Sequence, residues 1–214
     1  MLNKVHLHAL ILIFIFCCLF TLPAHLSVAQ ENDFEALRRE AVKIKTLKAD
    51  FVQKKSMKIL SRPLVSEGLF YFATPDAFRW EYSRPLRSIV LSYKNNTKRY
   101  LYSEGKMVED KTGGVQSMKI VLGEVAGWMT GKFDQNPSFK ATISKMANTS
   151  SITLTPVDEN MKGMIEKIEI LLASRSGIVK SVKISEGAGN FTQIDFNNVK
   201  INETIDASVF RDVK

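Results

Sequence analysis

The stretch VSEGLFYFATPDAFRWEY, residues 65–82, decides the fold of this chain. Its first part, Val65–Phe72, is strand-like and dense in aromatic residues. Its last part alternates Phe78, Trp80 and Tyr82 with charged residues, a period of two that is typical of a strand with one buried face. The sequence Thr-Pro-Asp between the two parts has the composition of a turn. The stretch therefore predicts an antiparallel hairpin with aromatic side chains on one face.

The same period continues on both sides of this hairpin. Leu47, Ala49 and Phe51 alternate with other residues before it, and Ile89 and Leu91 do so after it. Further strands are expected at residues 98–102, 139–143, 152–154, 168–172, 178–184, 194–196 and 199–201. A helix capped at Asn32 or Asp33 precedes the strands, with apolar positions Phe34, Leu37, Ala41 and Ile44. One or two short helical pieces are expected within residues 115–129. The pattern predicts an α+β domain with a large, strongly curved antiparallel sheet.

Residues 1–29 have the three regions of a cleavable secretory signal. Lys4 provides a small positive start, residues 9–22 are almost wholly apolar, and the small residues before Gln30 offer a signal peptidase site. A permanent anchor is the alternative, but the apolar run is short of the roughly 20 residues that cross a bilayer. We therefore predict a signal peptide over 1–29 and a single domain over 30–214 that works outside the cytoplasm.

Removing the signal also removes side chains that catalysis and metal binding use most. Every histidine and cysteine of the chain lies before the predicted cleavage site (His6, His8, Cys17, Cys18 and His25). The remaining domain then has no imidazole or thiolate for nucleophilic catalysis, for zinc or for a disulfide. Its carboxylates are scattered, with no obvious acidic pair. We predict that the protein is not an enzyme and that it needs no cofactor or metal.

The charge of the chain gives little support to nucleic-acid binding. The net charge of +8 falls to +7 when Lys4 is removed, and the basic residues are spread along the chain. A nucleic-acid groove would concentrate them in a stripe. We expect no nucleic-acid partner, and only a mild attraction to acidic membranes or partners.

The aromatic strands leave two interpretations open. An ordinary packed core is the first. In the second, the sheet curls without closing tightly, helices cover its mouth, and the interior forms an apolar cavity. Methionines at 118, 129, 161 and 164 would suit the lining of such a cavity, because thioethers adapt to irregular ligands.

Several motifs in collinear order resemble the LolA-type periplasmic lipoprotein carriers. They are LKADFVQ at 47–53, GLFYFATP at 68–75, FRWEY at 78–82 with Pro85, SIVLS at 88–92, TLTP at 153–156 and DASVF at 206–210. No single motif is strict, but the ordered set spans essentially all of the chain after residue 30.

The resemblance implies an unclosed antiparallel β half-barrel with a helical lid over a hydrophobic cavity. It also implies a periplasmic carrier that takes acylated lipoproteins, or a related lipid, from an inner-membrane transporter to an outer-membrane acceptor. We expect such a carrier to be a monomer. The regulatory alternative is a periplasmic lipid-sensing module that binds a membrane signalling protein, and a lipid-directed enzyme is a third reading.

Carried over residue by residue, the resemblance implies a set of ligand-binding positions. Phe78 matches an exposed Phe at the cavity mouth, and Leu37 matches an apolar position on the covering helix. The other implied or expected apolar positions of the cavity and mouth are Phe51, Phe70, Phe72, Trp80, Tyr82, Ile89 and Leu91. One departure concerns the lid. Several carriers have an Arg before the hairpin Pro that fastens the lid, whereas Thr74 stands here and Arg79 is the nearest candidate substitute.

Overall fold

The computed structural model describes residues 24–94, 96–111, 123–146, 149–173 and 177–213. Its strands are β1 Thr46–Ser56, β2 Leu64–Ala73, β3 Ala77–Arg84, β4 Ser88–Tyr93, β5 Asn96–Ser103, β6 Lys106–Glu109, β7 Phe139–Met146, β8 Thr149–Pro156, β9 Lys167–Leu172, β10 Val179–Gly187 and β11 Asn190–Ile201. Its helices are α2 Ala24–Ala41, α4 Glu159–Lys162 and the 3-10 helix η1 Ala207–Phe210, and residues 123–129 are also helical.

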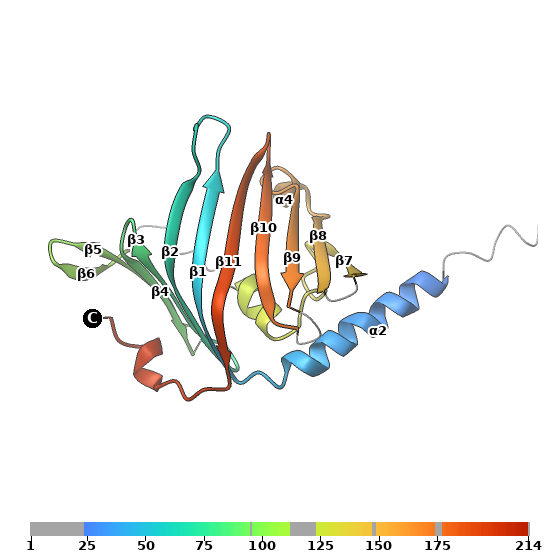
Figure 1. Ribbon diagram of the computed structural model, residues 1–214, viewed down its shortest axis with the longest axis horizontal. Helices are drawn as coiled ribbons and strands as arrows, with labels where there is room; N and C mark the ends of the chain where they lie inside the picture. Colours follow the sequence, from blue (N-terminus) through green and yellow to red (C-terminus); the bar gives the residue numbers. More distant parts are fainter. Residues whose placement is uncertain (1–23, 95, 112–122, 147–148, 174–176, 214) are drawn as a thin grey trace, which may run out of the picture.

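The strands form one antiparallel sheet that does not close on itself. Its order is β6-β5-β4-β3-β2-β1-β11-β10-β9-β8-β7 (Figure 1). The chain therefore builds outward from β1 to one edge at β6, continues at the other edge with β7, and returns inward to pair β11 with β1. The predicted α+β class and unclosed antiparallel sheet are confirmed.

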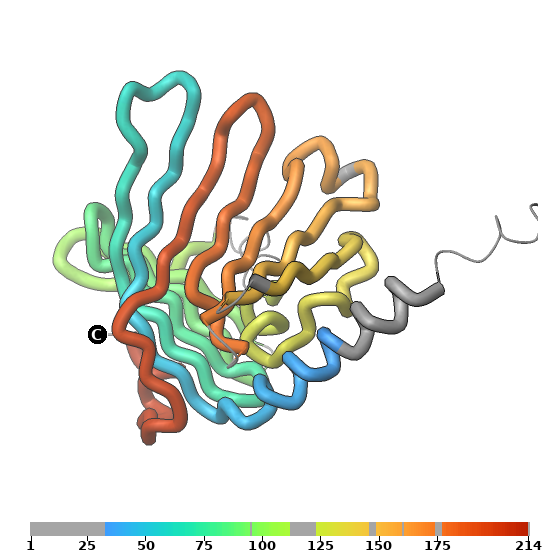
Figure 2. The backbone as a smooth tube through the Cα atoms, turned by 45° about the vertical axis from the view of Figure 1, so that its right-hand side comes forward, coloured from blue at the N-terminus to red at the C-terminus, as the bar shows by residue number. Residues whose placement is uncertain are grey.

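Residues 110–138 connect the two edge strands, and their described part covers the inner face of the sheet. Val125, Trp128, Met129 and Phe133 of this segment are buried in the same cluster as the inward side chains of the strands. α2 lies at the end of the sheet where β1 begins, and the sheet curls around the interior (Figure 2). The helical cover lies on one face of the sheet, and the C-terminal segment with η1 packs on the other face, where Arg79 of β3 holds it.

Gly68 lets two aromatic rings pack on the inner face. It pairs with Phe51 on one side and with Tyr82 on the other. A Cβ on this residue would lie 1.9 Å from the carbonyl oxygen of Glu81 and 2.7 Å from the Phe51 ring. The ring of Phe51 therefore occupies the space above Gly68 that a side chain would fill, and it meets Tyr82 edge-on with 5.2 Å between centroids.

Some boundaries differ from the sequence prediction. α2 begins at Ala24 and not after a cap at Asn32 or Asp33, because the sequence between Pro23 and that point contains no helix-breaking residue. Ile44 is buried, but it lies beyond the last residue of α2.

The two strands predicted at 194–196 and 199–201 are a single strand, β11. It carries an irregularity opposite Lys48 and Asp50, where Asn198 has φ 51° and donates to the Asp50 carboxylate at 2.6 Å. Of the helical pieces predicted at 115–129, residues 115–122 lie outside the described residues, and 123–129 are helical. The short elements β6, α4 and η1 were not predicted.

Candidate functional site

The inner face of the sheet presents a continuous apolar surface. In the cross-strand register, Leu47, Ala49 and Phe51 of β1 share this face with their neighbours on both sides. Its other buried members on the strands include Phe70, Phe72, Phe78, Trp80, Val90, Ile152, Leu154, Ile168, Ile170, Val182, Ile194 and Phe196. The period of two places these side chains inward, so this part of the predicted site is assembled as one surface.

An aromatic cluster lies at the centre of this surface. The Phe51 and Trp80 ring centroids are 4.6 Å apart, and Phe70 is 5.3 Å from Trp80. Phe196 of β11 completes the cluster at 5.9 Å from Phe70 and 6.0 Å from Trp80. The sequence analysis did not place Phe196 in the site, although its alternation with Ile194 was the available signal. The Tyr82 hydroxyl donates to Gln53 at 2.9 Å, and burial raises the pKa of this phenol.

A small cavity lies beneath the helical cover, among the residues that the structure describes. This cavity has a volume of about 90 Å³ and is lined by Glu124, Trp128, Asn136, Ser138, Phe139, Met161, Ile165, Ile168 and Ile184. Pockets that hold drug-sized ligands measure about 300–1,000 Å³. This cavity is therefore smaller than a site for a drug-sized ligand.

The polar groups of this cavity are few. Burial raises the pKa of Glu124, and the hydrogen bond that Asn136 donates to it at 2.6 Å offsets part of that effect. The indole N–H of Trp128 is buried and has no acceptor among the described residues. Met161 lines the cavity and Met129 is buried nearby, whereas Met164 is exposed and Met118 lies outside the described residues.

Phe78 is not exposed at a mouth, contrary to the expectation from the resemblance. Its side chain is 5% exposed and belongs to the buried cluster, because it pairs with Phe72 on one side and with Ser92 on the other. Leu37 of α2 is partly buried against the same cluster, as expected for a residue on a covering helix.

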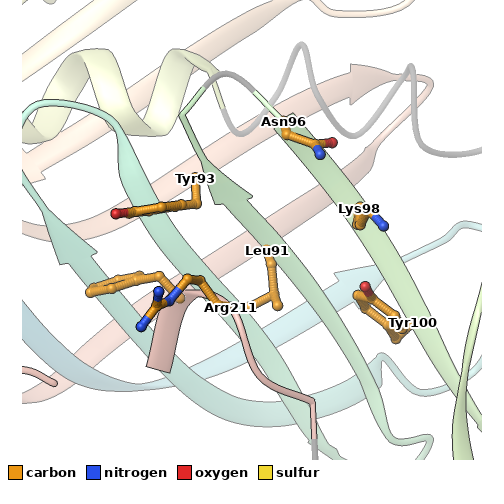
Figure 3. A pocket seen from close by; sticks show the side chains of 7 residues that line it. Leu91, Tyr93, Asn96, Lys98, Tyr100 and Arg211 are labelled. Atoms are coloured by element: carbon orange, nitrogen blue, oxygen red, sulfur yellow. The ribbon is translucent and has the colours of Figure 1, made fainter. Parts of the chain in front are cut away.

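Ile89 and Leu91 lie on the opposite face of the sheet from the aromatic cluster, so they do not line the interior. Leu91 pairs with Arg79 and Ile89 pairs with Glu81, and both partners alternate with Trp80 along β3. A cavity of about 200 Å³ lies on this outer face, between β4, β5 and η1 (Figure 3). It is lined by Leu91, Tyr93, Asn96, Lys98, Tyr100, Phe210 and Arg211.

Arg79 forms hydrogen bonds with the C-terminal segment and not with the helical cover. Its guanidinium donates to the carbonyl oxygens of Val209 at 3.1 Å and Asp212 at 2.8 Å, and its Nε donates to Glu81 at 2.7 Å. These contacts are on the outer face, so the expectation that Arg79 replaces a lid-fastening Arg is wrong. Thr74, at the position of that Arg, is exposed in the turn.

The contact between α2 and the covering segment comes from two other residues. Arg38 of α2 donates to Asp134 at 2.8 Å and to Glu35 at 2.7 Å. Gly131 has φ 76°, and a Cβ there would lie 2.8 Å from the Cα of Arg38. Only a glycine permits this approach, because both the positive φ and the missing side chain are needed.

Fold and site together define the class of this protein: an α+β half-barrel whose apolar inner face is covered by helical segments. The family model described as outer membrane lipoprotein carrier protein LolA matches residues 42–212, and the chain belongs to this family. The described part of the chain has no helix that is long and apolar enough to cross a membrane.

Individual relatives and a solved structure show the extent of the similarity. The outer-membrane lipoprotein carrier protein of Pseudoalteromonas translucida is 24% identical over 182 residues, which cover 84% of this chain and 82% of the relative. That of Pseudomonas aeruginosa strain UCBPP-PA14 is 28% identical over 189 residues, covering 86% of each. The solved structure of a LolA superfamily protein from Nitrosomonas europaea is 7% identical, with a TM-score of 0.41 over 83% of this chain and 97% of the other.

Proposed function

We propose that this protein is a periplasmic carrier that encloses acyl chains of lipoproteins, or of a related lipid, against the inner face of its sheet. In this role it receives cargo from an inner-membrane transporter and delivers it to an outer-membrane acceptor. The observation that carries the proposal is the continuous apolar inner face, covered by helical segments in a chain of the LolA family. We further propose that residues 1–29 are removed on export and that 30–214 form the working domain.

The energetics of lipid transfer support this use of the interior. Each buried methylene contributes about 0.8 kcal/mol, so one acyl chain of ordinary length resists leaving a membrane by roughly 10 kcal/mol. An apolar interior offsets this cost without directional bonds that would slow release. We propose the inward residues Phe51, Phe70, Phe72, Phe78, Trp80 and Tyr82 as the sheet side of the binding surface, with Leu37 on the helical side.

We propose that the cover opens when cargo binds, since the cavity of about 90 Å³ that the described residues line beneath it is smaller than pockets for drug-sized ligands. We propose that α4 and residues 123–138 move away from the sheet. Among the described residues, their contacts with the sheet include side-chain packing around Trp128, Met161 and Ile165 and one backbone hydrogen bond, from the Val157 amide to the Ser138 carbonyl at 2.9 Å.

The test is extraction of lipoprotein from membranes. The exported chain, with its N-terminus determined by mass spectrometry, is incubated with inner-membrane vesicles that contain a radiolabelled lipoprotein and its transporter. We expect acylated cargo in the soluble fraction in complex with the chain, and no transfer of the same cargo lacking its acyl chains. A chain that purifies empty and extracts no lipoprotein contradicts the proposal. Recovery of a membrane signalling protein in place of lipid would favour the regulatory alternative.

A variant that fills the cavity tests where the cargo binds. Ile184 of β10 is partly buried and lines the cavity, so Ile184→Trp places an indole where an acyl chain would enter. We expect extraction to fall about tenfold, equivalent to leaving roughly two methylene groups unburied. The control is Val108→Trp on β6, an exposed position away from the cavity. Equal extraction by both variants places the cargo elsewhere.

A further inference from the structure

The end of the β1–β2 hairpin carries a group of exposed apolar side chains. Of the twelve large apolar side chains that are exposed in the described residues, four lie between residues 59 and 65. They are Ile59 at 87%, Leu60 at 38%, Leu64 at 54% and Val65 at 46% exposure. We call residues 54–65 the finger. Leu64 and Val65 are consecutive on a strand and so point to opposite faces. Both are exposed, so neither face of the finger is covered by the described part of the chain.

The finger is an ordered projection. Lys54 and Lys55 still pair with Val65 and Leu64, and the tip is closed by a hydrogen bond from the Leu60 amide to the Met57 carbonyl at 2.9 Å. The Lys58 amide donates to the Asn190 side chain at 2.8 Å, which braces the finger against the start of β11. Figure 1 shows the β1–β2 hairpin extending beyond the neighbouring hairpins, at the end of the sheet opposite α2.

Cations surround the apolar tip. The finger contains Lys54, Lys55, Lys58 and Arg62 and no acidic residue. Lys55 is paired with Glu186 at 3.0 Å, whereas Lys54, Lys58 and Arg62 are exposed and form no ion pair among the described residues. The nearest acidic residue after the finger in the chain, Glu67, is paired with Arg84. Three cations next to the tip are thus available to a negatively charged partner.

From this geometry we propose that the finger docks the protein on a bilayer surface containing anionic phospholipid. Apolar side chains at the end of a narrow projection enter the boundary between headgroups and acyl chains, and the lysines and arginine around them attract anionic headgroups. A protein partner would need a groove that fits the projecting tip, whereas a fluid bilayer accommodates it without a preformed site. The inference does not depend on what the interior carries.

Flotation with lipid vesicles tests the proposal. The exported chain is mixed with vesicles of phosphatidylcholine alone, or of phosphatidylcholine with phosphatidylglycerol, at low and high salt. We expect it to float with the anionic vesicles and to be released by salt, because the attraction falls off within a Debye length. Ile59→Ser should lower the partition coefficient about tenfold, and the control Val157→Ser, also exposed, should leave it unchanged. These vesicles contain no lipoprotein, so failure here leaves the proposed carrier function unaffected.

The charged part of the finger is tested separately. Lys58→Ser and Arg62→Ser should each lower the partition coefficient for anionic vesicles about fivefold. The matched control removes Lys140 and Lys180, which are exposed on β7 and β10. Equal binding to both kinds of vesicle, binding to neither, or equal effects of the finger and control variants would overturn the proposal.

A position-specific readout completes the test. No cysteine occurs after Cys18, so Ile59→Cys and Val157→Cys each introduce a single thiol into the exported chain. An environment-sensitive fluorophore at 59 should shift to the blue with anionic vesicles, and the same fluorophore at 157 should not. A blue shift at 157 without one at 59 would show that another surface meets the membrane.

Discussion

At the scale of single residues, one missing side chain organises the centre of the inner face. Gly68 leaves room for the Phe51 ring, and that ring contacts both Trp80 and Tyr82. The cluster therefore depends on a residue that contributes no apolar atoms itself.

Gly68→Ala should lower the free energy of unfolding by about 3 kcal/mol, because the new methyl group collides with backbone and with the Phe51 ring. Gly123→Ala is the control, since a Cβ there meets nothing within 4 Å. We expect the control to change stability by less than about 1 kcal/mol in urea unfolding. Similar losses for both variants would contradict the role given to Gly68.

Glu124 gives the stability of the closed interior a pH dependence. Burial raises its pKa, so the folded state favours the protonated carboxyl group. The contribution of Glu124 is therefore most favourable below its unfolded pKa and is lost as the pH rises through the folded value. In urea unfolding between about pH 4 and pH 7, the wild-type chain should lose stability relative to Glu124→Gln as the pH rises. A difference that is constant with pH would show that this carboxyl group does not titrate abnormally.

At the scale of elements, the covering segment and the C-terminal segment use different contacts. Gly131 and the Arg38–Asp134 ion pair bring residues 130–134 against α2, whereas Arg79 holds the segment that ends in η1 on the outer face. The exposed ion pair contributes at most about 1 kcal/mol, so close packing at Gly131 matters more for the position of the cover.

Gly131→Ala should loosen the cover, because its Cβ would lie 2.8 Å from the Cα of Arg38. Hydrogen exchange of residues 123–138 should become faster, with little change in the strands. Gly189→Ala is a matched control: its φ of 81° gives a similar backbone strain, but a Cβ there meets nothing within 4 Å. Equal exchange in the covering segment of both variants would mean that the contact with α2 does not hold the cover closed.

At the scale of the whole molecule, both tryptophans of the chain face the interior. Trp80 lies in the aromatic cluster and Trp128 lines the small cavity, and both are almost completely buried. Sheet and cover thus each contribute one fluorophore to the space that the cargo would occupy.

A fatty acid with bromine atoms along its chain should quench this fluorescence, because bromine acts only at short range and must enter the interior. Dissolved iodide should quench little, since the indoles are buried. The Ile184→Trp variant, which adds a third tryptophan at the cavity, should bind less of the brominated chain in a separation assay. Quenching by iodide but not by the brominated chain would place the tryptophans outside the binding surface.

The sequence predicted most of the sheet but only part of the site. The predicted strands correspond to β1 to β5 and β7 to β10. Alternation of buried with more exposed positions is regular in β1, β2, β8 and β9. It gave the wrong side for Ile89 and Leu91. In β4 four consecutive residues are buried, from Ile89 to Ser92, so apolar character does not tell its two faces apart. Phe78 was placed at a mouth by resemblance, and its burial depends on neighbours in β2 and β4.

The sequence by itself determined the strand periodicity, the aromatic face of β2 and β3 and the collinear motifs of the family, because these are properties of residues close together in the chain. Only the tertiary structure decided which face of β4 is inside, the size of the cavity beneath residues 123–138, and that apolar side chains of the finger are exposed. Those features depend on register and on packing between segments far apart in sequence, such as residues 123–138 against β9 and β10. The apolar inner face could thus be predicted from the sequence, whereas the way the cover packs on it could not.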